Sequence, residues 1–255
     1  MPKNWKIIAA SVPGTAHVRR EAACQDAFAY RVFETNAGEI LIIAVADGAG
    51  SAKFGENGAR TACNFFVSGT AGLVENGGKF SDINEDFFSG FLKMLPDALA
   101  TDKENSNVND YACTFLAVAA SETGTVFAQI GDGAIVYASE PDEFCLFAVP
   151  QQGEYANTTN FITDENAFEN LLFKRFENRI EELAIFTDGL QRLAIDFQSK
   201  NAHQPFFRSM FAPLRAKNPA TNLEEKLSAF LNSPKINERT DDDKTLILAS
   251  RFTNE

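Results

Sequence analysis

The sequence predicts an α+β fold, a sandwich of mainly antiparallel sheets flanked by helices. Short runs rich in Ile, Val and Phe follow one another along the chain. Some are separated only by a turn signal, as in "VFAQIGDGAIVYAS", which is typical of a hairpin at Asp132-Gly133. Patterns with the helical period occur in separate groups between these runs. Consecutive strands with grouped helices favour this class over a doubly wound parallel sheet.

The individual elements follow from the period of the apolar residues. Strand-like runs lie at residues 5–12, 27–33, 39–46, 112–120, 124–130, 133–139, 144–149, 158–163, 179–187 and 244–251. Apolar residues at i, i+3, i+4 and i+7 predict helices around residues 59–66, 87–99 and 223–231. The polar residues 101–110 predict a loop. Residues 196–221 predict a helical insertion in an otherwise single domain over residues 1–255.

Composition and charge narrow the functional classes. The 255 residues are 45% hydrophobic and 23% charged, as in an ordinary globular protein, and 24 Phe predict a core rich in phenyl rings. The net charge of −12 argues against nucleic acid or anionic membrane as a partner, because both require a basic surface. No apolar stretch approaches the ~20 residues of a membrane span. We therefore expect a cytoplasmic protein.

The four cysteines predict free thiols. Cys24, Cys63, Cys113 and Cys145 are widely spaced and form no C-x-x-C motif. This spacing argues against a zinc site or a disulfide framework. Buried thiols in a reducing compartment are the simpler interpretation.

Two apolar runs end at an Asp-Gly pair. Asp47-Gly48 leads into a loop of small residues and then a helix, and Asp188-Gly189 leads into another helical pattern. A hairpin turn therefore does not explain them, although it does explain Asp132-Gly133. A strand that is apolar on both faces is covered on both, so the carboxylate at its end is partly desolvated.

Such carboxylates indicate a site for a hard divalent cation. A desolvated carboxylate costs several kcal/mol unless it is paired or bound to metal. The glycine after each aspartate lets a main-chain carbonyl approach an ion closely. A ligand set of oxygen atoms favours Mg²⁺ or Mn²⁺ over Zn²⁺. The acidic run from Asp241 to Asp243 is on its own typical of a solvated loop. Gln25-Asp26, just before the strand-like run at 27–33, indicates nothing on its own.

Six motifs in order make the chain similar to a known family. They are "CQDAF", "VADGAGS…ENGA", "YACTFLAVAA", "IGDG", "FTDG" and "DDDKTLIL". This series resembles the metal-dependent protein phosphatases of type 2C, the PPM family, over residues 7–248. "GTAHVRREAACQDAF" and "NTTNFIT" resemble its short bacterial branch. The resemblance implies a four-layer α-β-β-α sandwich with two, and in some members three, Mn²⁺ or Mg²⁺ ions.

The resemblance also implies a set of metal ligands. Asp47 corresponds to the aspartate that bridges two metals, and Gly48 to the glycine that contributes its carbonyl. Asp188 and the acid before the last strand complete the shell of the first metal. Alignment makes that acid Asp242 and puts Asp243 in the place of the family's asparagine, although a slip of one residue would exchange them. Asp132 corresponds to an acid that helps to hold a third metal.

Two positions depart from the family pattern. The usual Glu-Asp pair appears as Gln25-Asp26, and a neutral amide binds a second metal more weakly than a carboxylate does. Asp26 can compensate directly or through water. The arginine that grips phosphate has no clean counterpart. Arg19 and Arg20 lie near its expected place and are candidates, each with a solvated surface as the alternative.

The implied reaction is hydrolysis of a phosphomonoester, most readily phosphoserine or phosphothreonine on a protein substrate with a cognate kinase. In the family a metal-bridging water attacks phosphorus directly. His17 is a candidate for protonating the leaving alkoxide, with a solvated loop histidine as the alternative. Two other functions compete. One is a pseudophosphatase or binding module, which Gln25 favours. The other is a nucleotide-binding enzyme, although "DGAGSAKFGENG" lacks the spacing of a P-loop.

Overall fold

The computed structural model of the chain describes residues 4–36, 38–100, 107–151, 159–217 and 221–252. The chain divides into two compact units, each built from segments distant in the sequence. Unit 1 comprises Met1–Cys24, Ala134–Val149 and Ile180–Glu255, and unit 2 comprises Gln25–Gly133 and Pro150–Arg179. Each unit consists of one antiparallel five-stranded sheet with helices on one of its faces.

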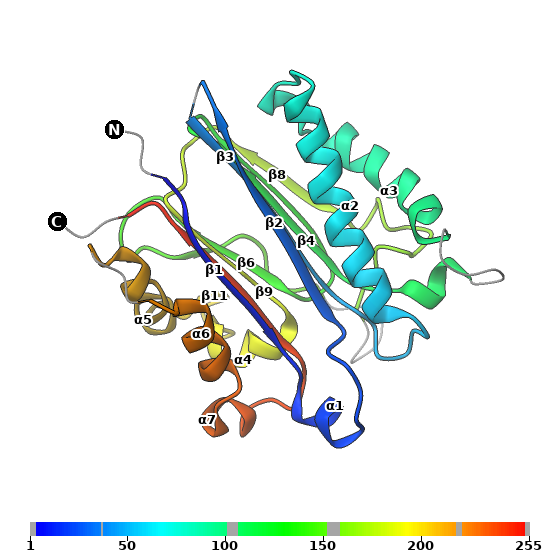
Figure 1. Cartoon of the computed structure of the whole chain (residues 1–255), viewed down its shortest axis with the longest axis vertical. Helices are drawn as coiled ribbons and strands as arrows, with labels where there is room; N and C mark the ends of the chain where they lie inside the picture. The colour runs from blue at the N-terminus through cyan, green and yellow to red at the C-terminus, as the bar shows by residue number, and fades with distance from the viewer. Residues whose placement is uncertain (1–3, 37, 101–106, 152–158, 218–220, 253–255) are drawn as a thin grey trace. The chain divides into compact units, whose positions relative to one another are not determined.

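The sheet of unit 2 has the strand order β2-β3-β4-β5-β8, with antiparallel neighbours throughout. Its strands are β2 (Asp26–Thr35), β3 (Gly38–Asp47), β4 (Phe115–Ala120), β5 (Thr125–Ile130) and β8 (Leu172–Phe176). The helices α2 (Gly55–Glu75) and α3 (Glu85–Ala100) cover one face (Figure 1). Short 3₁₀ turns lie at Phe80–Asp82 and Val108–Tyr111.

The core of unit 2 forms where alternate apolar residues of a strand pack against apolar residues that recur with the helical period. Alternate residues of β3, among them Ile42 and Ala44, belong to one apolar cluster with Ala59 and Phe66, which recur on α2 with helical spacing. The phenyl rings of this cluster pack closely. Phe66 lies 5.4 Å from Phe115, measured between ring centroids. The predicted core of phenyl rings and the helices predicted around residues 59–66 and 87–99 are therefore confirmed.

Unit 1 repeats this plan with the strand order β1-β12-β9-β6-β7. Its strands are β1 (Lys6–Val12), β6 (Ala134–Ala138), β7 (Cys145–Leu146), β9 (Glu182–Phe186) and β12 (Lys244–Ser250). Its helices are α1 (Thr15–Arg19), α4 (Gln191–Ala194), α5 (Gln204–Arg215), α6 (Leu223–Leu231) and α7 (Pro234–Asn237), with a 3₁₀ turn at Asp188–Leu190. Apolar residues of α5 and α6, including Phe207 and Leu231, join the sheet residues Phe186 and Leu248 in one core.

Several predicted elements differ from the structure. The hairpin at Asp132-Gly133 is wrong, because β5 and β6 lie in different sheets and pair with other strands. Residues 159–163 form no strand, and residue 158 lies outside the described residues. The edge strand β8 was not predicted, because "LFKRF" spans only five positions and has two consecutive charged residues in place of a strand-like alternation.

The predicted insertion at 196–221 begins with a small hairpin of β10 (Ile195–Asp196) and β11 (Asn201–Ala202), and α5 follows it. Residues 218–220 lie outside the described part. The predicted loop at 101–110 ends in the 3₁₀ turn Val108–Tyr111, and residues 101–106 are likewise not described.

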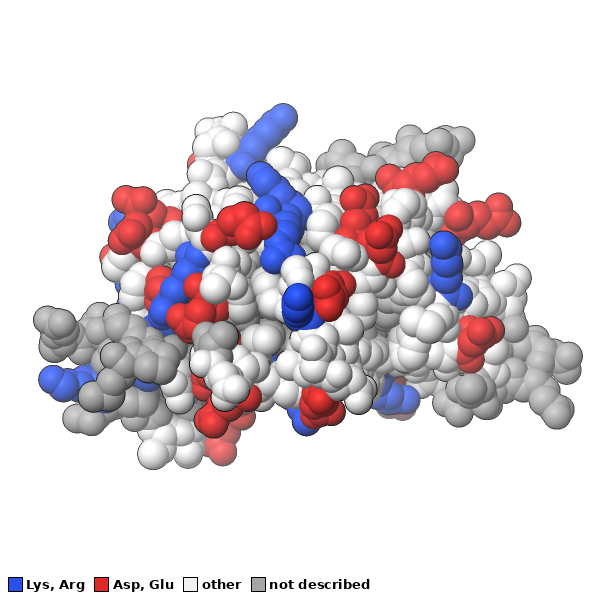
Figure 2. Space-filling model, turned by 90° about the horizontal axis from the view of Figure 1, so that it is seen from above, with Lys and Arg blue, Asp and Glu red and all other residues white. Residues whose placement is uncertain are grey.

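The surface and the cysteines mostly agree with expectation. On the face that Figure 2 draws, acidic and basic side chains are interspersed. Within the described residues, no helix combines the length and apolar character that crossing a bilayer requires. All four cysteines are free, as predicted. Only Cys63 and Cys113 are fully buried, whereas Cys145 is exposed on the two-residue edge strand β7.

Candidate metal centre

Two predicted ligands of unit 2 lie directly opposite each other at one end of the sheet. Asp47 is the last residue of β3 and Asp26 the first of β2, and the strand register pairs them. Asp26 is buried, with 7% of its surface exposed. Two carboxylates facing each other across a strand pair repel, and a bound cation removes that repulsion.

The loop after Asp47 requires a glycine. A Cβ atom on Gly48 would lie 2.4 Å from the carbonyl carbon of Gly55, the first residue of α2, so no larger residue fits there. The Gly48 amide donates to the carbonyl oxygen of Gln25 at 3.1 Å. These contacts bring the main chain of residues 25 and 48 together beside Asp47. The predicted ligands Gln25, Asp26, Asp47 and Gly48 therefore form one group.

Asp132 lies in a loop of the same unit. Gly131 adopts φ +102°, a left-handed conformation that favours glycine, and its amide donates to Oε1 of Gln151 at 2.6 Å. A Cβ atom on Gly131 would lie 2.6 Å from Cγ2 of Thr114, the residue that the strand register places opposite Asp47. Thr114 therefore contacts both the Asp132 loop and the end of β3.

Thr114 also binds the main chain of Asp47. Its amide donates to the Asp47 carbonyl at 2.8 Å, and its hydroxyl oxygen accepts from the Asp47 amide at 3.0 Å. The sequence analysis did not single out this residue. The signal that could have found it is the polar side chain next to the apolar strand "FLAVAA".

Two buried thiols lie beneath these acids. Burial raises the pKa of the Cys63 thiol well above its usual value, and nearby Cys113 and Asp26 raise it further. Burial also raises the pKa of Cys113, with a further contribution from the Asp47 carboxylate. Because the thiolate is the form that binds metals, these neutral thiols are poor ligands. The candidate metal donors in unit 2 are therefore oxygen atoms.

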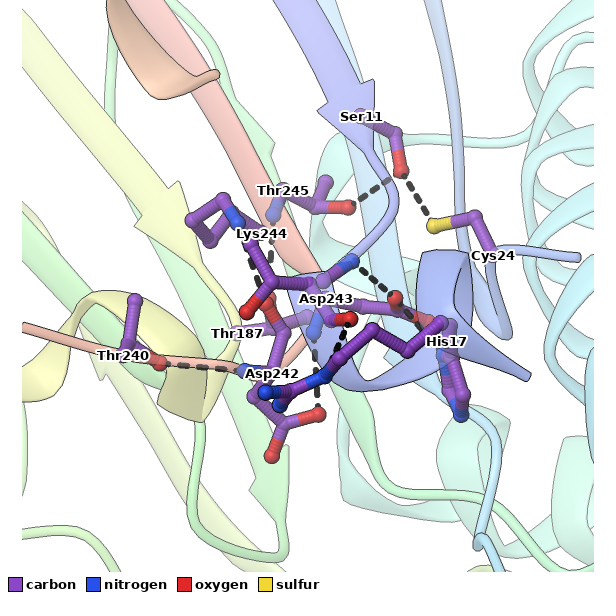
Figure 3. A network of polar contacts seen from close by, with 12 residues as sticks. Ser11, His17, Cys24, Thr187, Thr240, Asp242, Asp243, Lys244 and Thr245 are labelled. Carbon is purple, nitrogen blue, oxygen red and sulfur yellow. Dashed lines mark hydrogen bonds and ion pairs between the residues drawn. The ribbon is translucent and has the colours of Figure 1, made fainter. Parts of the chain in front are cut away.

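The predicted ligands of unit 1 lie where β9 ends and β12 begins, and Figure 3 shows Asp242 and Asp243 there with Thr187. Asp188 follows β9 in the 3₁₀ turn Asp188–Leu190. A Cβ atom on Gly189 would lie 2.0 Å from the carbonyl oxygen of Asp243. The turn can therefore approach the main chain of Asp243 this closely only with glycine at position 189. The Thr187 hydroxyl accepts from the Thr245 amide at 3.1 Å, which ties the two strand ends together.

Asp242 and Asp243 differ sharply in their surroundings. Asp243 is 2% exposed, and its Oδ1 accepts from the Gly14 amide at 2.6 Å and lies 2.8 Å from Nδ1 of His17. Asp242 is exposed, and its Oδ1 accepts from the Asp243 amide at 2.9 Å. Asp243 is therefore engaged in holding α1, whereas Asp242 keeps carboxylate lone pairs for another ligand.

The basic segment on α1 contains residues of two kinds. His17 is paired with Asp243, with 17% of its side chain exposed, so it is not a solvated loop histidine. Arg19 is largely exposed, lies 3.5 Å from Asp241 and donates from Nε to the Thr15 carbonyl. Arg20 is exposed. The predicted phosphate ligands are thus exposed side chains, Arg19 at the end of α1 and Arg20 directly after it.

Lys244 is a second residue that the sequence did not indicate. Its side chain is fully buried, and Nζ donates to Oδ1 of Asn237 and to the carbonyl oxygen of Asp242. A lysine after three acids is typical of a solvated run, so the sequence does not indicate that Lys244 is buried. In the structure it fixes the main chain from which the Asp242 side chain leaves.

The candidate donors within each unit are of the kind that a hard cation prefers. In unit 2 the donors are carboxylate, amide and main-chain oxygens, and in unit 1 they are carboxylates on a rigid turn. Oxygen donors of this kind suit Mg²⁺ and Mn²⁺. Among the described residues, no group of three or more His, Cys, Asp or Glu side chains is arranged to hold a metal ion.

Comparison with known proteins identifies relatives over the whole chain. A family model described as "Protein phosphatase 2C" matches residues 13–232. Serine/threonine-protein phosphatase 3 of Escherichia coli K12 is 39% identical over an alignment of 251 residues. The alignment covers 96% of this chain and 98% of that protein.

Solved structures with the same fold include a serine/threonine phosphatase and RsbX. The serine/threonine phosphatase of S. agalactiae has a TM-score of 0.65 at 19% identity, with 98% of this chain and 100% of that chain covered. The structure of RsbX in complex with magnesium has a TM-score of 0.56 at 16% identity, with 98% and 96% covered. At these identities the likeness shows the fold alone, and it confirms the predicted fold class.

Proposed function

This chain belongs to the protein phosphatase 2C family, and on that premise we propose that it is a metal-dependent phosphatase that hydrolyses phosphoserine or phosphothreonine in proteins. The observation that carries the proposal is the 39% identity, over nearly all of both chains, to a bacterial serine/threonine-protein phosphatase. Acids at the ends of apolar strands support it, because Asp47 and Asp188 both occur where the family's metal ligands are expected.

We assign the metal ligands as the resemblance implies. Asp47 would serve two metals, and the Gly48 carbonyl would contribute beside it. Asp188 and Asp242 would complete the shell of the first metal, Gln25 and Asp26 would serve the second, and Asp132 would help to hold a third. The contacts within each unit support this set, because Gln25 and Gly48 share a hydrogen bond and Gly189 packs on the Asp243 carbonyl. When bound, Mn²⁺ or Mg²⁺ supplies Lewis-acid charge neutralisation and lowers the pKa of water.

The basic segment of α1 serves the substrate. Nδ1 of His17 is hydrogen-bonded to Asp243, so in the doubly protonated imidazolium form Nε2 would be the nitrogen that gives a proton to the leaving alkoxide. Arg19 and Arg20 are the candidates for binding phosphoryl oxygens, and Arg19 would exchange its exposed pair with Asp241 for the ligand. Asp243 is a positioning residue in this scheme. A phosphoprotein substrate with its kinase, a cytoplasmic location and a single catalytic domain over residues 1–255 are further parts of the proposal.

Removing the metal tests the function. The protein is incubated with EDTA, dialysed and assayed on a phosphothreonine peptide and on p-nitrophenyl phosphate while Mn²⁺ or Mg²⁺ is added back. We expect turnover to disappear with EDTA and to return with the metal. The competing function is a pseudophosphatase, which the neutral Gln25 favours. Absence of turnover at every metal concentration, with a metal-dependent rise of Tm retained, would favour that alternative.

A pair of substitutions separates the roles of Asp242 and Asp243. Asp242→Asn is expected to weaken Mn²⁺ binding by more than about tenfold, because it removes a charged ligand. Asp243→Asn keeps the oxygen that accepts from Gly14 and faces His17 but removes its negative charge, so we expect the Mn²⁺-induced rise of Tm to persist while kcat falls because the His17 ring loses its anionic partner. Calorimetric titration with Mn²⁺ and steady-state kinetics give the two readouts. The opposite pattern would exchange the assignments.

A further inference from the structure

The loop that carries Asp132 is held by two glutamines. Gln129, at the end of β5, donates from Nε2 to the carbonyl oxygens of Gly131 at 3.3 Å and Gly133 at 3.1 Å. The side-chain Oε1 of Gln151 accepts from the Gly131 amide at 2.6 Å. The main-chain amide of Gln151 donates to the Gly131 carbonyl oxygen at 3.3 Å. Main-chain groups on both sides of Asp132 are therefore fixed.

Gln151 is itself anchored at its far end. Its Nε2 donates to the carbonyl oxygen of Asn170 at 2.7 Å, and Nδ2 of Asn160 lies 3.2 Å from its Oε1. These partners belong to the segment Pro150–Arg179, which is far from Asp132 in the sequence. The loop position thus depends on a side chain that comes from another part of unit 2.

Burying the Gln129 side chain lowers the stability of the fold, which indicates a role for this residue beyond packing. It is fully buried in β5, where its strand partners are Leu116 and Leu172. Its Oε1 has no hydrogen-bond partner within the described residues. A buried amide that uses only one of its two polar atoms is less stabilising than an apolar side chain of the same shape. Stability alone therefore does not favour glutamine here.

We propose that Gln129 and Gln151 are positioning residues for Asp132, which set the main chain from which its carboxylate reaches a metal. The proposal rests on the function proposed above and adds residues to it. It explains why a polar side chain occupies a buried strand position next to Gly131-Asp132-Gly133. It also explains the left-handed conformation of Gly131, because that conformation directs the Gly131 amide toward Oε1 of Gln151.

The test uses Gln151→Ala and Gln129→Met in the full chain. Loss of residues that orient a metal ligand typically costs about 10–100-fold in metal affinity or activity. We expect both variants to raise, within that range, the Mn²⁺ concentration that gives half of the maximal Tm rise, and to raise equally the concentration that half-activates hydrolysis. Asp132→Asn should give the same shift, and Gln151→Ala should add nothing further in the Asp132→Asn background.

Gln204→Ala is the matched control. Gln204 accepts from the Phe144 amide at 3.0 Å and donates to the carbonyl oxygens of Phe144 and Ala202, so it also clamps main chain through three bonds. It holds a segment without candidate site residues. We expect this variant to lower Tm without changing the Mn²⁺ dependence of either readout.

Three results would overturn the inference: the same Mn²⁺ dependence in the Gln151 and Gln204 variants, additive effects of Gln151→Ala and Asp132→Asn, or a silent Asp132→Asn. Gln129→Met keeps the test decisive if Gln151→Ala does not fold. These outcomes presuppose a wild type that turns over with Mn²⁺. A wild type that shows no such turnover would instead contradict the proposed function.

Discussion

Asp47→Asn is expected to abolish metal-dependent hydrolysis, with kcat/KM lowered by more than the ~100-fold upper range for residues that only orient a ligand. Asp47 is assigned to two metals at once, so a neutral amide weakens both sites. Without metal, the variant should be as stable as the wild type or slightly more stable, because Asp26 and Asp47 face each other across β2 and β3. Like charges in that position destabilise a sheet.

The measurement combines kinetics with thermal unfolding, both with and without Mn²⁺. Asp82→Asn is the control, because Asp82 is an exposed acid of the same unit that only caps a 3₁₀ turn. We expect the Asp82 variant to keep full metal-dependent activity. Turnover that is unchanged in Asp47→Asn would exclude Asp47 as a ligand. Loss of turnover together with a large drop in the Tm of the metal-free protein would indicate damage to the fold.

Glu182→Gln is expected to destabilise unit 1 by about 3–5 kcal/mol, the range for breaking a buried ion pair. The Glu182 side chain is fully buried and bonds Arg215 at 2.8 Å through Nε and 2.5 Å through Nη2. This pairing raises the pKa of Arg215, so the guanidinium stays charged at any accessible pH. With Gln at position 182, Asp142 is the one carboxylate among the described residues that still pairs with this cation, and its side chain is 45% exposed.

Glu75→Gln provides the comparison with an exposed Glu–Arg pair at a similar nitrogen–oxygen distance. Glu75 lies 2.6 Å from Arg31, but both side chains are 51% exposed, so we expect a change of only about 0–1 kcal/mol. Urea unfolding of the two variants gives the free energies. Mn²⁺-dependent activity below the unfolding transition should survive in both. Equal destabilisation by the two substitutions would show that burial does not decide the strength of these pairs.

Much of the site could be predicted because its signals are local. An apolar run followed by Asp-Gly and then a helical pattern needs no knowledge of distant residues, and it located both Asp47 and Asp188. The order of six such motifs was sufficient to predict the family, which the comparisons then confirmed. The same local logic failed at Asp132-Gly133, because a strand-turn-strand pattern does not say with which sheet the second strand pairs.

Other features depend on residues that the sequence separates widely. Asp242 and Asp243 are indistinguishable in a run of three acids, and only the contacts of Asp243 with Gly14 and His17, more than two hundred positions away, make one buried and leave the other exposed. The contact of Gln151 with Gly131 is likewise invisible in the chain order.

The sequence by itself determined the α+β class, the strands that end in acids and the oxygen chemistry of the site, since side-chain period and residue type are properties of short segments. Only the tertiary structure decided the partners of each strand, the separate surroundings of the neighbouring acids and the glutamines around Asp132. Those outcomes depend on burial and on hydrogen bonds between distant segments, and both are established only when the chain has folded.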